Sequence, residues 1–422
     1  MTDALSVYEM GRRAKAATQA LAQAQSVQKN AALDAMAAAL LAAETEILAA
    51  NRADLAQAEQ KGASRAMLDR LALNPARLQD MAAGLWALME LPDPIGEEMR
   101  RWRAAEDIEI IQQRVPLGVV GIIYEARPNV TADAAGISLK CGNAVILRGG
   151  SDALRSNLAV GEALRQGVAA AGLPADAVQV VADGGRESAN ELMHLKEFVD
   201  VLIPRGGAGL IQTVLREATV PVIETGAGNC HIYIEKTANP DWAEQILLNA
   251  KVQRPAVCNA VETLLIDRAL VDSLLPRLVR ALSAAGVEVR GCNETYAALQ
   301  RAGMTAILAS EADFAAEYSD LIIACKVVGD YKEAVAHINK YGTRHSECIV
   351  TDDVTAAAYF QSSVDAAAVY VNASTRFTDG FQFGFGAEIG ISTQKLHARG
   401  PMGLIAMTTY KYLINGQGQT RP

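Results

Sequence analysis

The stretch Ala144-Val-Ile-Leu-Arg148-Gly-Gly-Ser151 joins a short apolar run to a glycine turn, and a helical pattern follows it from Ala153 to Ala171. Four consecutive apolar residues predict a buried strand, and the glycines predict a tight turn before the helix. The same order recurs at Val199 to Ile203, where Arg205-Gly206-Gly207 leads to a helical pattern from Leu210 to Arg216. Short apolar strands between helices predict an α/β fold with helices on both faces of a parallel sheet.

The pattern extends in both directions from these two units. Residues 5–90 are alanine-rich with helical periodicity, which predicts a helical layer over the sheet. After Cys258 the alternation resumes and predicts a second α/β domain. Near the end, Gly403 to Ile414 alternates like an edge strand, which could pair with another subunit. Further strands are expected at 108–111, 119–123, 178–181, 220–223, 263–266, 287–289, 306–308, 321–328 and 348–350, and further helices at 188–195, 271–285 and 332–340.

Length and composition limit the class of protein. At 422 residues the chain is too long for one compact core, and its net charge of −9 without any basic tract argues against a nucleic-acid surface. No run of about 18 apolar residues occurs, and the start lacks the order of a secretory signal. The six cysteines are scattered without a CxxC pair, which indicates free thiols and no metal site. These features predict a soluble cytoplasmic enzyme.

Cys258 is the candidate nucleophile. It lies in Lys251-Val-Gln-Arg-Pro-Ala-Val-Cys258-Asn-Ala260, a short polar break between a helix-like stretch and the strand-like residues 261–266. A thiol in such a break can be held still and partly open, as a reactive thiolate requires. A cysteine flanked by Val257 and Ala260 is more often a small buried apolar side chain.

The two glycine loops are candidate phosphate-binding turns, because backbone amides at a strand end and helix start can approach a phosphate. Neither loop has the G-x-G-x-x-G spacing of the common dinucleotide fingerprint, and glycine turns also occur at strand ends for steric reasons. The first loop carries Arg148 and Ser151 and no acidic residue in its first three positions. A ribose 2′-phosphate tolerates this loop better than it would tolerate one with a glutamate, so NADPH is expected rather than NADH.

Five blocks resemble the gamma-glutamyl phosphate reductase family (glutamate-5-semialdehyde dehydrogenases) of the aldehyde dehydrogenase superfamily. They occur in the expected order over nearly the whole chain. The blocks are Tyr124-Glu-Ala-Arg127-Pro-Asn129, Glu224-Thr-Gly-Ala-Gly-Asn-Cys-His231, Gln253-Arg-Pro-Ala-Val-Cys258-Asn-Ala, Tyr341-Gly-Thr-Arg-His345-Ser-Glu-Cys-Ile349 and Phe383-Gly-Phe-Gly-Ala-Glu-Ile-Gly-Ile391.

The resemblance implies an aldehyde-dehydrogenase-like fold of two doubly wound parallel-sheet domains plus a small oligomerisation element. The expected ranges are an NADPH-binding domain at 1–230 (with 100–116 partly in the oligomerisation element), a catalytic domain with Cys258 at 231–390, and a C-terminal return and oligomerisation element at 391–422. It also implies NADPH-dependent reduction of L-glutamate 5-phosphate to L-glutamate 5-semialdehyde and phosphate through a cysteine thioester. That reaction is the second step of proline synthesis from glutamate.

The catalytic and substrate residues follow from matching positions in these blocks, and the cofactor residues follow from the pattern of the superfamily. Cys258 matches the nucleophile, Asn129 the amide that donates to the oxyanion, and Glu224 a glutamate that in the superfamily activates water, a role that makes little sense beside a phosphate leaving group. For the cofactor, Arg148, Gly149 and Ser151 match the adenosine ribose site, Arg205, Gly206 and Gly207 the pyrophosphate end, and Glu317 the nicotinamide ribose. His345 is a candidate for lowering the thiol pKa, and Arg127 and Arg254 for binding substrate anions.

Ordinary structural roles are the alternative for several of these residues. Asn129 can be a turn residue, Glu224 can cap a turn, His345 can be a loop histidine bonded to backbone, and the two arginines can be solvated. For the whole chain, the alternatives are a non-phosphorylating aldehyde dehydrogenase and a silent homologue that binds a partner. The unstable acyl phosphate makes a glutamate 5-kinase a candidate partner, and a homo-oligomer is expected.

Overall fold

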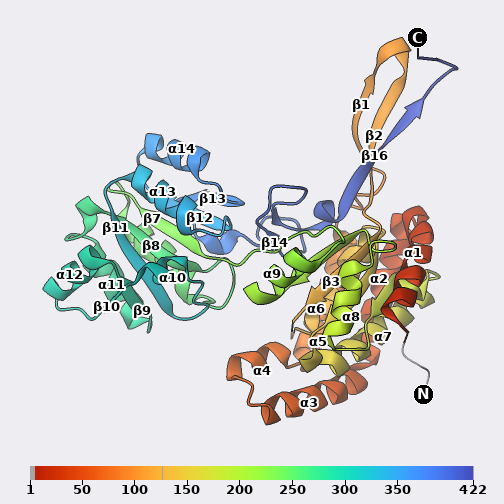
Figure 1. The fold of residues 1–422 in the computed structure, drawn as a ribbon, viewed down its shortest axis with the longest axis horizontal. Coiled ribbons are helices and arrows are strands. Elements are labelled where there is room, and N and C mark those ends of the chain that lie inside the picture. Colours follow the sequence, from red (N-terminus) through yellow and green to blue (C-terminus); the bar gives the residue numbers. More distant parts are fainter. Residues whose placement is uncertain (1–4, 126, 422) are drawn as a thin grey trace. The chain divides into compact units, whose positions relative to one another are not determined.

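The computed structural model describes residues 5–125 and 127–421, which form two compact units (Figure 1). The first comprises residues up to Thr225 together with Gly384–Gly390 and the segment from Met402, and the second comprises Gly226–Phe383 and Ile391–Pro401. The C-terminal return expected for 391–422 is therefore divided between the units. Ala126, in the block around Arg127, lies outside the described residues.

Unit 1 begins with the predicted helical layer. Its helices are α1 (Val7–Gln23), α2 (Ser26–Ala42), α3 (Glu44–Gln60), α4 (Arg65–Leu71) and α5 (Pro75–Glu90). The side chains of Ser6, Ser64 and Asn74 accept hydrogen bonds from backbone amides of the first turns of α1, α4 and α5, which satisfies donors that a helix start leaves open. In α2 the apolar side chains recur at helical spacing, and Leu33, Met36 and Leu40 are fully buried.

The sheet of unit 1 has four parallel strands in the order β5 (Val178–Val180), β4 (Ala144–Gly149), β3 (Val119–Tyr124) and β6 (Val201–Arg205). The helices α6 (Asn129–Lys140), α7 (Leu154–Ala170), α8 (Arg186–His194) and α9 (Ala208–Glu217) alternate with these strands. The chain moves outward from β3 to β5 and then returns to the other side of β3. The sheet therefore has its topological switch point between β3 and β6, where α/β sheets bind ligands.

The strand expected at 220–223 is wrong. Only one bridge forms there, between Leu202 and Val222. The Leu202 amide donates to the Pro221 carbonyl and the Ile223 amide to the Leu202 carbonyl. Pro221 has no amide hydrogen to extend the ladder, so the pairing stops.

A second sheet of unit 1 is a three-stranded antiparallel ribbon. It pairs β1 (Glu98–Arg103) with β2 (Glu109–Pro116), and β2 with the C-terminal strand β16 (Thr408–Asn415) (Figure 1). The alternation near the C-terminus therefore forms a strand as predicted. Its partner in the structure is β2 of the same chain.

Unit 2 contains a seven-stranded, fully parallel sheet. Its order is β10 (Ile307–Leu308), β9 (Glu288–Gly291), β11 (Ile322–Val328), β8 (Val261–Asp267), β7 (Cys230–Ile234), β12 (Ser346–Val350) and β13 (Ala368–Val371). The helices are α10 (Pro240–Val252), α11 (Leu275–Ala284), α12 (Asn293–Arg301), α13 (Tyr331–Tyr341) and α14 (Val354–Ser363), and a short pair, β14 (Ile391–Ser392) with β15 (Gly400–Pro401), completes the unit.

The two faces of this sheet carry separate cores. Ile232 and Leu264 pack with α10, α11 and α12, while their neighbours Tyr233 and Leu265 pack with α13 and α14. Successive residues of a strand point to opposite faces, so strands buried on both sides must be apolar throughout, as the sequence pattern predicts. The doubly wound α/β architecture is thereby confirmed. Over the described residues, no helix is both long and apolar enough to cross a membrane.

Candidate active site

Cys258 lies at the amino-terminal edge of the unit 2 sheet. Its loop follows α10 and precedes β8, Cys230 is the first residue of β7, and His345 directly precedes β12. Ligands of parallel sheets more often bind beyond the carboxyl ends of the strands. Here the candidate nucleophile and His345 gather at the opposite edge instead.

Gly228 fixes the backbone of the nucleophile by close approach. A Cβ atom at this position would lie 1.5 Å from the Cys258 carbonyl oxygen, 2.3 Å from its carbonyl carbon and 2.6 Å from its Cα atom. Only glycine permits this backbone-to-backbone contact. The segment before β7 therefore supports the loop that carries Cys258.

A second segment holds the residue after the nucleophile. The Thr375 hydroxyl donates to the Asn259 carbonyl at 2.7 Å, and the Asn259 side-chain amide donates to the Thr378 carbonyl at 2.9 Å. The Arg376 guanidinium donates to the Asn259 side-chain oxygen and, through Nε, to Gln253 Oε1 at 2.9 Å. These bonds connect the loop to a short 3₁₀ helix (Thr375–Phe377) and leave little freedom to the Cys258–Asn259 backbone.

The cysteine thiols differ in their exposure to solvent. Cys141, Cys230, Cys325 and Cys348 are buried, whereas Cys258 and Cys292 are half-buried. Burial raises the pKa of both Cys325 and Cys348 to about 12, and it raises the pKa of Cys141 and Cys230 as well. A thiol that stays protonated and enclosed is a poor nucleophile.

His345 lies against Cys230. Its Nδ1 is 2.8 Å from the Ser346 hydroxyl and 3.8 Å from Cys230 Sγ, and the Cys230 thiol donates to the Cys258 carbonyl at 3.2 Å. Burial lowers the pKa of His345 to about 4. The imidazole is therefore neutral near pH 7 and brings no positive charge to the thiol.

The other candidates of unit 2 lie on either side of this loop. Arg254 is exposed, four residues before Cys258. Glu317 is exposed too, and its charge helps to raise the pKa of Glu262 after the larger effect of burial. Glu262 forms a fully buried ion pair with Lys251 at 2.6 Å, which anchors the end of α10 to β8.

Asn129, Arg127 and Glu224 belong to unit 1. Asn129 is exposed at the first position of α6, and its side-chain amide donates to Asp133 Oδ2 at 3.1 Å, one turn further along the helix. Burial raises the pKa of Asp133 to about 6, against the opposing effects of the Asn129 hydrogen bond and the Arg205 charge. Arg127 is exposed and Glu224 is half-buried.

The loop after β4 carries Arg148, whose Nη2 donates to the Gly184 and Gly185 carbonyls at 2.8 and 2.6 Å. Its Nε is buried and has no partner among the described residues. A Cβ at Gly149 would lie 2.1 Å from the Asn157 side chain, so packing alone requires this glycine. Ser151 is exposed and begins a 3₁₀ turn.

The loop after β6 lies at the switch point, where Arg205 pairs with Tyr124 across β6 and β3. The amide of Gly207, the residue before α9, donates to Glu125 Oε2 at 2.9 Å. The start of α9 therefore holds an anionic oxygen in this structure, in the way that helix starts hold phosphates. Glu125 is exposed, and a pyrophosphate that displaced its carboxylate would meet the same Gly207 amide.

The residues of unit 1 thus fit an anionic nucleotide. Arg148, Gly149 and Ser151 follow β4, and Arg205, Gly206 and Gly207 follow β6, so both loops lie at the carboxyl edge of one sheet. Each unit brings its own candidates together: Cys258, His345 and Arg254 around one loop, and the two glycine loops at one sheet edge. Glu317 belongs to unit 2, whereas the other expected cofactor residues belong to unit 1.

Sequence reasoning missed several residues around these loops. Gly228 and Arg376 contact the Cys258 loop from positions 30 residues before and 118 residues after Cys258. Asp133 and Glu125 were missed as well. The spacing of Asn129 and Asp133 at i and i+4 on a helix was the one available signal, because such side chains lie on the same helix face.

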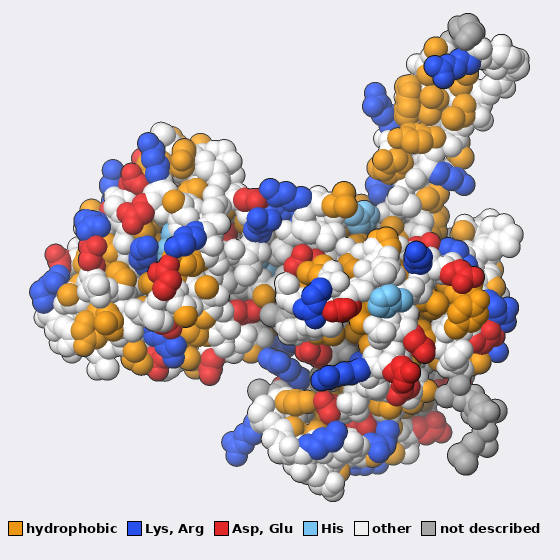
Figure 2. Space-filling view, in the orientation of Figure 1, with side chains coloured by type: hydrophobic (Ala, Val, Ile, Leu, Met, Phe, Trp, Pro, Cys, Tyr) orange, Lys and Arg blue, Asp and Glu red, His pale blue; other side chains and the backbone are white. Residues whose placement is uncertain are grey.

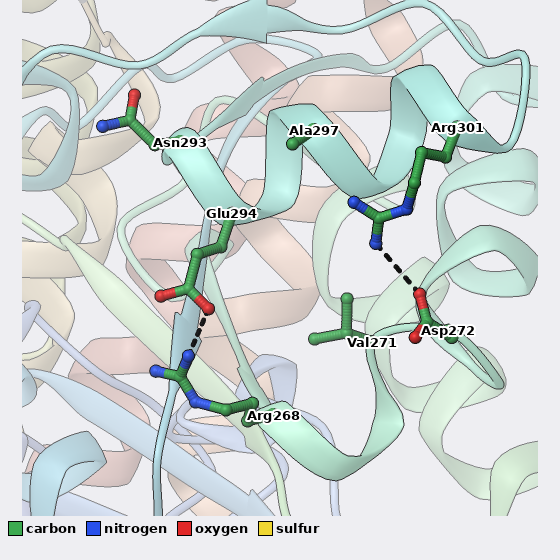
Figure 3. A pocket seen from close by; sticks show the side chains of 7 residues that line it. All are labelled: Arg268, Val271, Asp272, Asn293, Glu294, Ala297 and Arg301. Carbon is green, nitrogen blue, oxygen red and sulfur yellow. Dashed lines mark hydrogen bonds and ion pairs between the residues drawn. The ribbon is translucent and has the colours of Figure 1, made fainter.

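A surface hollow of about 450 Å³ lies elsewhere in unit 2, between η4 (Arg268–Leu270) and α12. Figure 3 shows its two arginines already paired, Arg268 with Glu294 and Arg301 with Asp272. None of the predicted site residues lines this hollow.

Known proteins resemble the chain over its whole length. Residues 4–295 match the model of the aldehyde dehydrogenase family. A gamma-glutamyl phosphate reductase of Heliobacterium modesticaldum is 57% identical over 97% of this chain and 98% of its own, and one of Moorella thermoacetica is 55% identical over 100% of both.

Solved structures agree. The crystal structure of a gamma-glutamyl phosphate reductase from Thermotoga maritima superposes with a TM-score of 0.96 at 45% identity, covering 99% of this chain and 100% of that one. An acetylating aldehyde dehydrogenase from Geobacillus thermoglucosidasius has a TM-score of 0.70 at 18% identity, covering 99% of this chain and 97% of its own, which shows a shared fold. The chain therefore belongs to the gamma-glutamyl phosphate reductases of the aldehyde dehydrogenase family.

Proposed function

We propose that this oxidoreductase reduces L-glutamate 5-phosphate with NADPH to L-glutamate 5-semialdehyde and phosphate, through a thioester on Cys258. The observation that carries the proposal is the setting of Cys258 within a chain that is 57% identical to a named gamma-glutamyl phosphate reductase. Its thiol is half-buried, and its backbone is held by Gly228 and by the bonds to Asn259. The proposed place of the reaction is the second step of proline synthesis from glutamate.

In this proposal the Cys258 thiolate attacks the acyl carbon, a C–S bond forms, and phosphate leaves with the electron pair of the broken C–O bond. NADPH supplies a hydride to the thioester carbon when it is bound. The thiohemiacetal then collapses to the aldehyde and returns the thiolate. Because Gly228 and Asn259 hold the Cys258 backbone, the sulfur is positioned in advance for both steps.

The remaining residues receive proposed roles around these steps. Asn129 donates its amide to the oxyanion, and Asp133 orients that amide through the bond at 3.1 Å. Glu224 belongs to the site without an assigned proton transfer. His345, being neutral, acts on the loop through Cys230. Arg127 and Arg254 bind substrate anions.

NADPH is proposed on the two loops of unit 1. Arg148 offers a half-buried guanidinium with an unpartnered Nε to the 2′-phosphate, and Ser151 lies in the same loop. Arg205, Gly206 and Gly207 lie at the start of α9 for the pyrophosphate, and Glu317 is assigned to the nicotinamide ribose. One feature opposes a 2′-phosphate: the Asp183 carboxylate is close enough to raise the pKa of Arg148, although burial, the larger effect, lowers it.

The test runs the reaction backward with semialdehyde, NADP⁺ and phosphate. We expect turnover that requires phosphate, forms an acyl phosphate and prefers NADP⁺ to NAD⁺. Cys258→Ser should lower the rate by at least about four orders of magnitude, because the nucleophile is lost. Cys292→Ser, which changes the other half-buried thiol, should leave it unchanged.

Two results would contradict the proposal. Turnover without phosphate that yields glutamate would assign the chain to a non-phosphorylating dehydrogenase. Full activity of Cys258→Ser would show that the reaction does not pass through a thioester on Cys258. The proposal also includes a homo-oligomer and delivery of the labile acyl phosphate by a glutamate 5-kinase; equal flux with a physically separated kinase would argue against that delivery.

A further inference from the structure

Arg376 is fixed beside the nucleophile by neutral partners. Its Nε donates to Gln253 Oε1 at 2.9 Å, and its Nη1 donates to the side-chain oxygen of Asn259, the residue that follows Cys258. A guanidinium has five N–H donors, and among the residues that the structure describes these two bonds leave its Nη2 group for another acceptor. The side chain is half-buried, burial lowers the pKa of Arg376, and the charge of an ionised Cys258 opposes that effect.

Arg376 forms no ion pair within the part of the chain that the structure describes, although the Asp379 carboxylate is close enough to act on its pKa. No carboxylate of residues 5–125 or 127–421 forms an ion pair with it, and its hydrogen-bond partners are amide oxygens. Burial lowers its pKa and the nearby charge of Arg254 lowers it further, while the charges of an ionised Cys258 and of Asp379 oppose these effects. Two cations therefore lie together at the thiol, whereas Arg268, Arg277, Arg290 and Arg301 of the same unit are all paired with carboxylates.

Other cations of the loop provide less charge at the thiol than Arg376. The His345 imidazole is neutral near pH 7, because burial lowers its pKa to about 4. Lys251 is fully buried, and its ammonium group forms an ion pair with Glu262 at 2.6 Å. Arg254 is exposed, so water screens its charge more strongly than that of half-buried Arg376.

A purely structural role does not account for Arg376. Asn259 is already held by the Thr375 hydroxyl at 2.7 Å and by the Thr378 carbonyl at 2.9 Å. Burying part of a guanidinium costs free energy unless an anion compensates it. The side chain that bears this cost lies beside the thiol that attacks the acyl carbon, and phosphate departs from that carbon.

We propose that Arg376 binds the phosphoryl group of the substrate, with its Nη2 donors on the phosphate oxygens, while Cys258 attacks the acyl carbon. This inference rests on the function proposed above. As the C–S bond forms and the C–O bond to phosphate breaks, negative charge increases on the leaving phosphate. A guanidinium fixed at that position stabilises the developing charge, and in the reverse direction it binds free phosphate.

The first measurement is the phosphate dependence of the reverse reaction. Arg376→Ala should raise KM for phosphate by about 10- to 100-fold, the loss expected for charge-assisted hydrogen bonds. Arg376→Lys keeps the charge without the fork of donors and should give a smaller rise. Arg301→Ala, whose arginine is paired with Asp272 on the same unit, is the matched control and should leave KM unchanged.

The second measurement separates binding from positioning. Acylation of Cys258 by the neutral ester p-nitrophenyl acetate, taken at its alkaline plateau, should stay within about threefold in Arg376→Ala, because no phosphate is involved. An equal loss in ester acylation and in the phosphate reaction would overturn the inference and leave Arg376 a positioning residue. An unchanged KM for phosphate would overturn it as well.

The third measurement does not depend on turnover. Inorganic phosphate should slow the alkylation of Cys258 by iodoacetamide in the unmodified protein and should not slow it in Arg376→Ala; Arg376→Gln replaces that variant if it does not fold. Protection that persists in the variant would contradict the inference. If the unmodified protein shows phosphate protection but no reductase activity, the proposed function fails while phosphate binding by Arg376 stands.

Discussion

At the scale of single residues, Gly228 sets the position of the thiol more strictly than any hydrogen bond in the loop. The Cβ of an alanine would meet the Cys258 carbonyl oxygen at 1.5 Å, and the nearest atoms are backbone, which cannot rotate away. Gly228→Ala should therefore shift the thiol by about 1 Å and lower the rate by at least about 100-fold. The check is the steady-state rate together with the alkylation rate of Cys258.

The control for this variant is Gly84→Ala. Gly84 lies within α5, and a Cβ there would meet only Asp133 Oδ1 at 3.9 Å, an ordinary contact. Alanine in a helix is favoured over glycine by about 0.5–1 kcal/mol, so this variant should be slightly more stable and fully active. Activity of Gly228→Ala within threefold of the unmodified protein would show that the loop can move and would refute the argument.

Asp133 makes a pH-dependent contribution to stability. Burial raises its pKa from 3.8 to about 6 in the fold. As pH rises, Asp133 therefore loses its proton at a lower pH in the unfolded chain than in the fold. Above about pH 6 the carboxylate is ionised in both states, and its full destabilising effect on the fold is present. The penalty is relieved as pH falls through 6 and is absent below the unfolded value.

Asp133→Asn should remove this dependence. Its thermal midpoint should exceed that of the unmodified protein by roughly 2–4 °C at about pH 8, for an effect of about 1 kcal/mol, and by less at about pH 5. Asp80→Asn, which changes an exposed carboxylate on α5, should show no such difference between the two pH values. A gain that is equal at both pH values would mean that Asp133 is already protonated or fully solvated in the fold.

At the scale of elements, local pattern predicts what depends on local burial. The apolar runs around β4, β6, β8 and β11 are buried on both faces, so each identified a strand by itself. The run at 220–223 failed because Pro221 interrupts the ladder. The C-terminal strand was predicted as an element, but its pairing with β2, where Thr408 lies opposite Pro116, depends on residues about three hundred positions apart.

The candidate site divides in the same way. Cys258 and the glycine loops could be found from sequence, because a thiol in a polar break and glycines after a strand are local signals. Arg376 could not, because its significance comes from the contacts with Gln253 and Asn259. Nor could the neutral state of His345, which results from burial by residues far along the chain.

At the scale of the whole molecule, the ribbon of β1, β2 and β16 leaves a row of apolar side chains uncovered. Tyr410, Tyr412 and Ile414 alternate along β16, share one face and are 48%, 52% and 62% exposed. Trp102 of β1 lies edge-on to Tyr412 with ring centroids 6.0 Å apart, so the face continues across the ribbon. In Figure 2 this ribbon shows as a band of hydrophobic side chains.

Such a face, with unpaired strand edges beside it, is expected to be covered by a second copy of the chain, since a small exposed sheet gains little stability alone. Tyr412→Asp should therefore shift the sedimenting species toward the monomer, because a carboxylate buried in that contact would lack a partner. Val354→Asp, which places the same charge at an 81% exposed valine of α14, should leave the sedimentation unchanged. If the unmodified protein already sediments as a monomer, or if Tyr412→Asp keeps the same assembly, the ribbon is not the contact between subunits.

In either variant the alkylation rate of Cys258 should be unaffected, because the ribbon belongs to unit 1 and the thiol to unit 2. If Cys258 of a monomeric variant is alkylated at the normal rate and the monomer still catalyses the reaction, each chain contains a complete site.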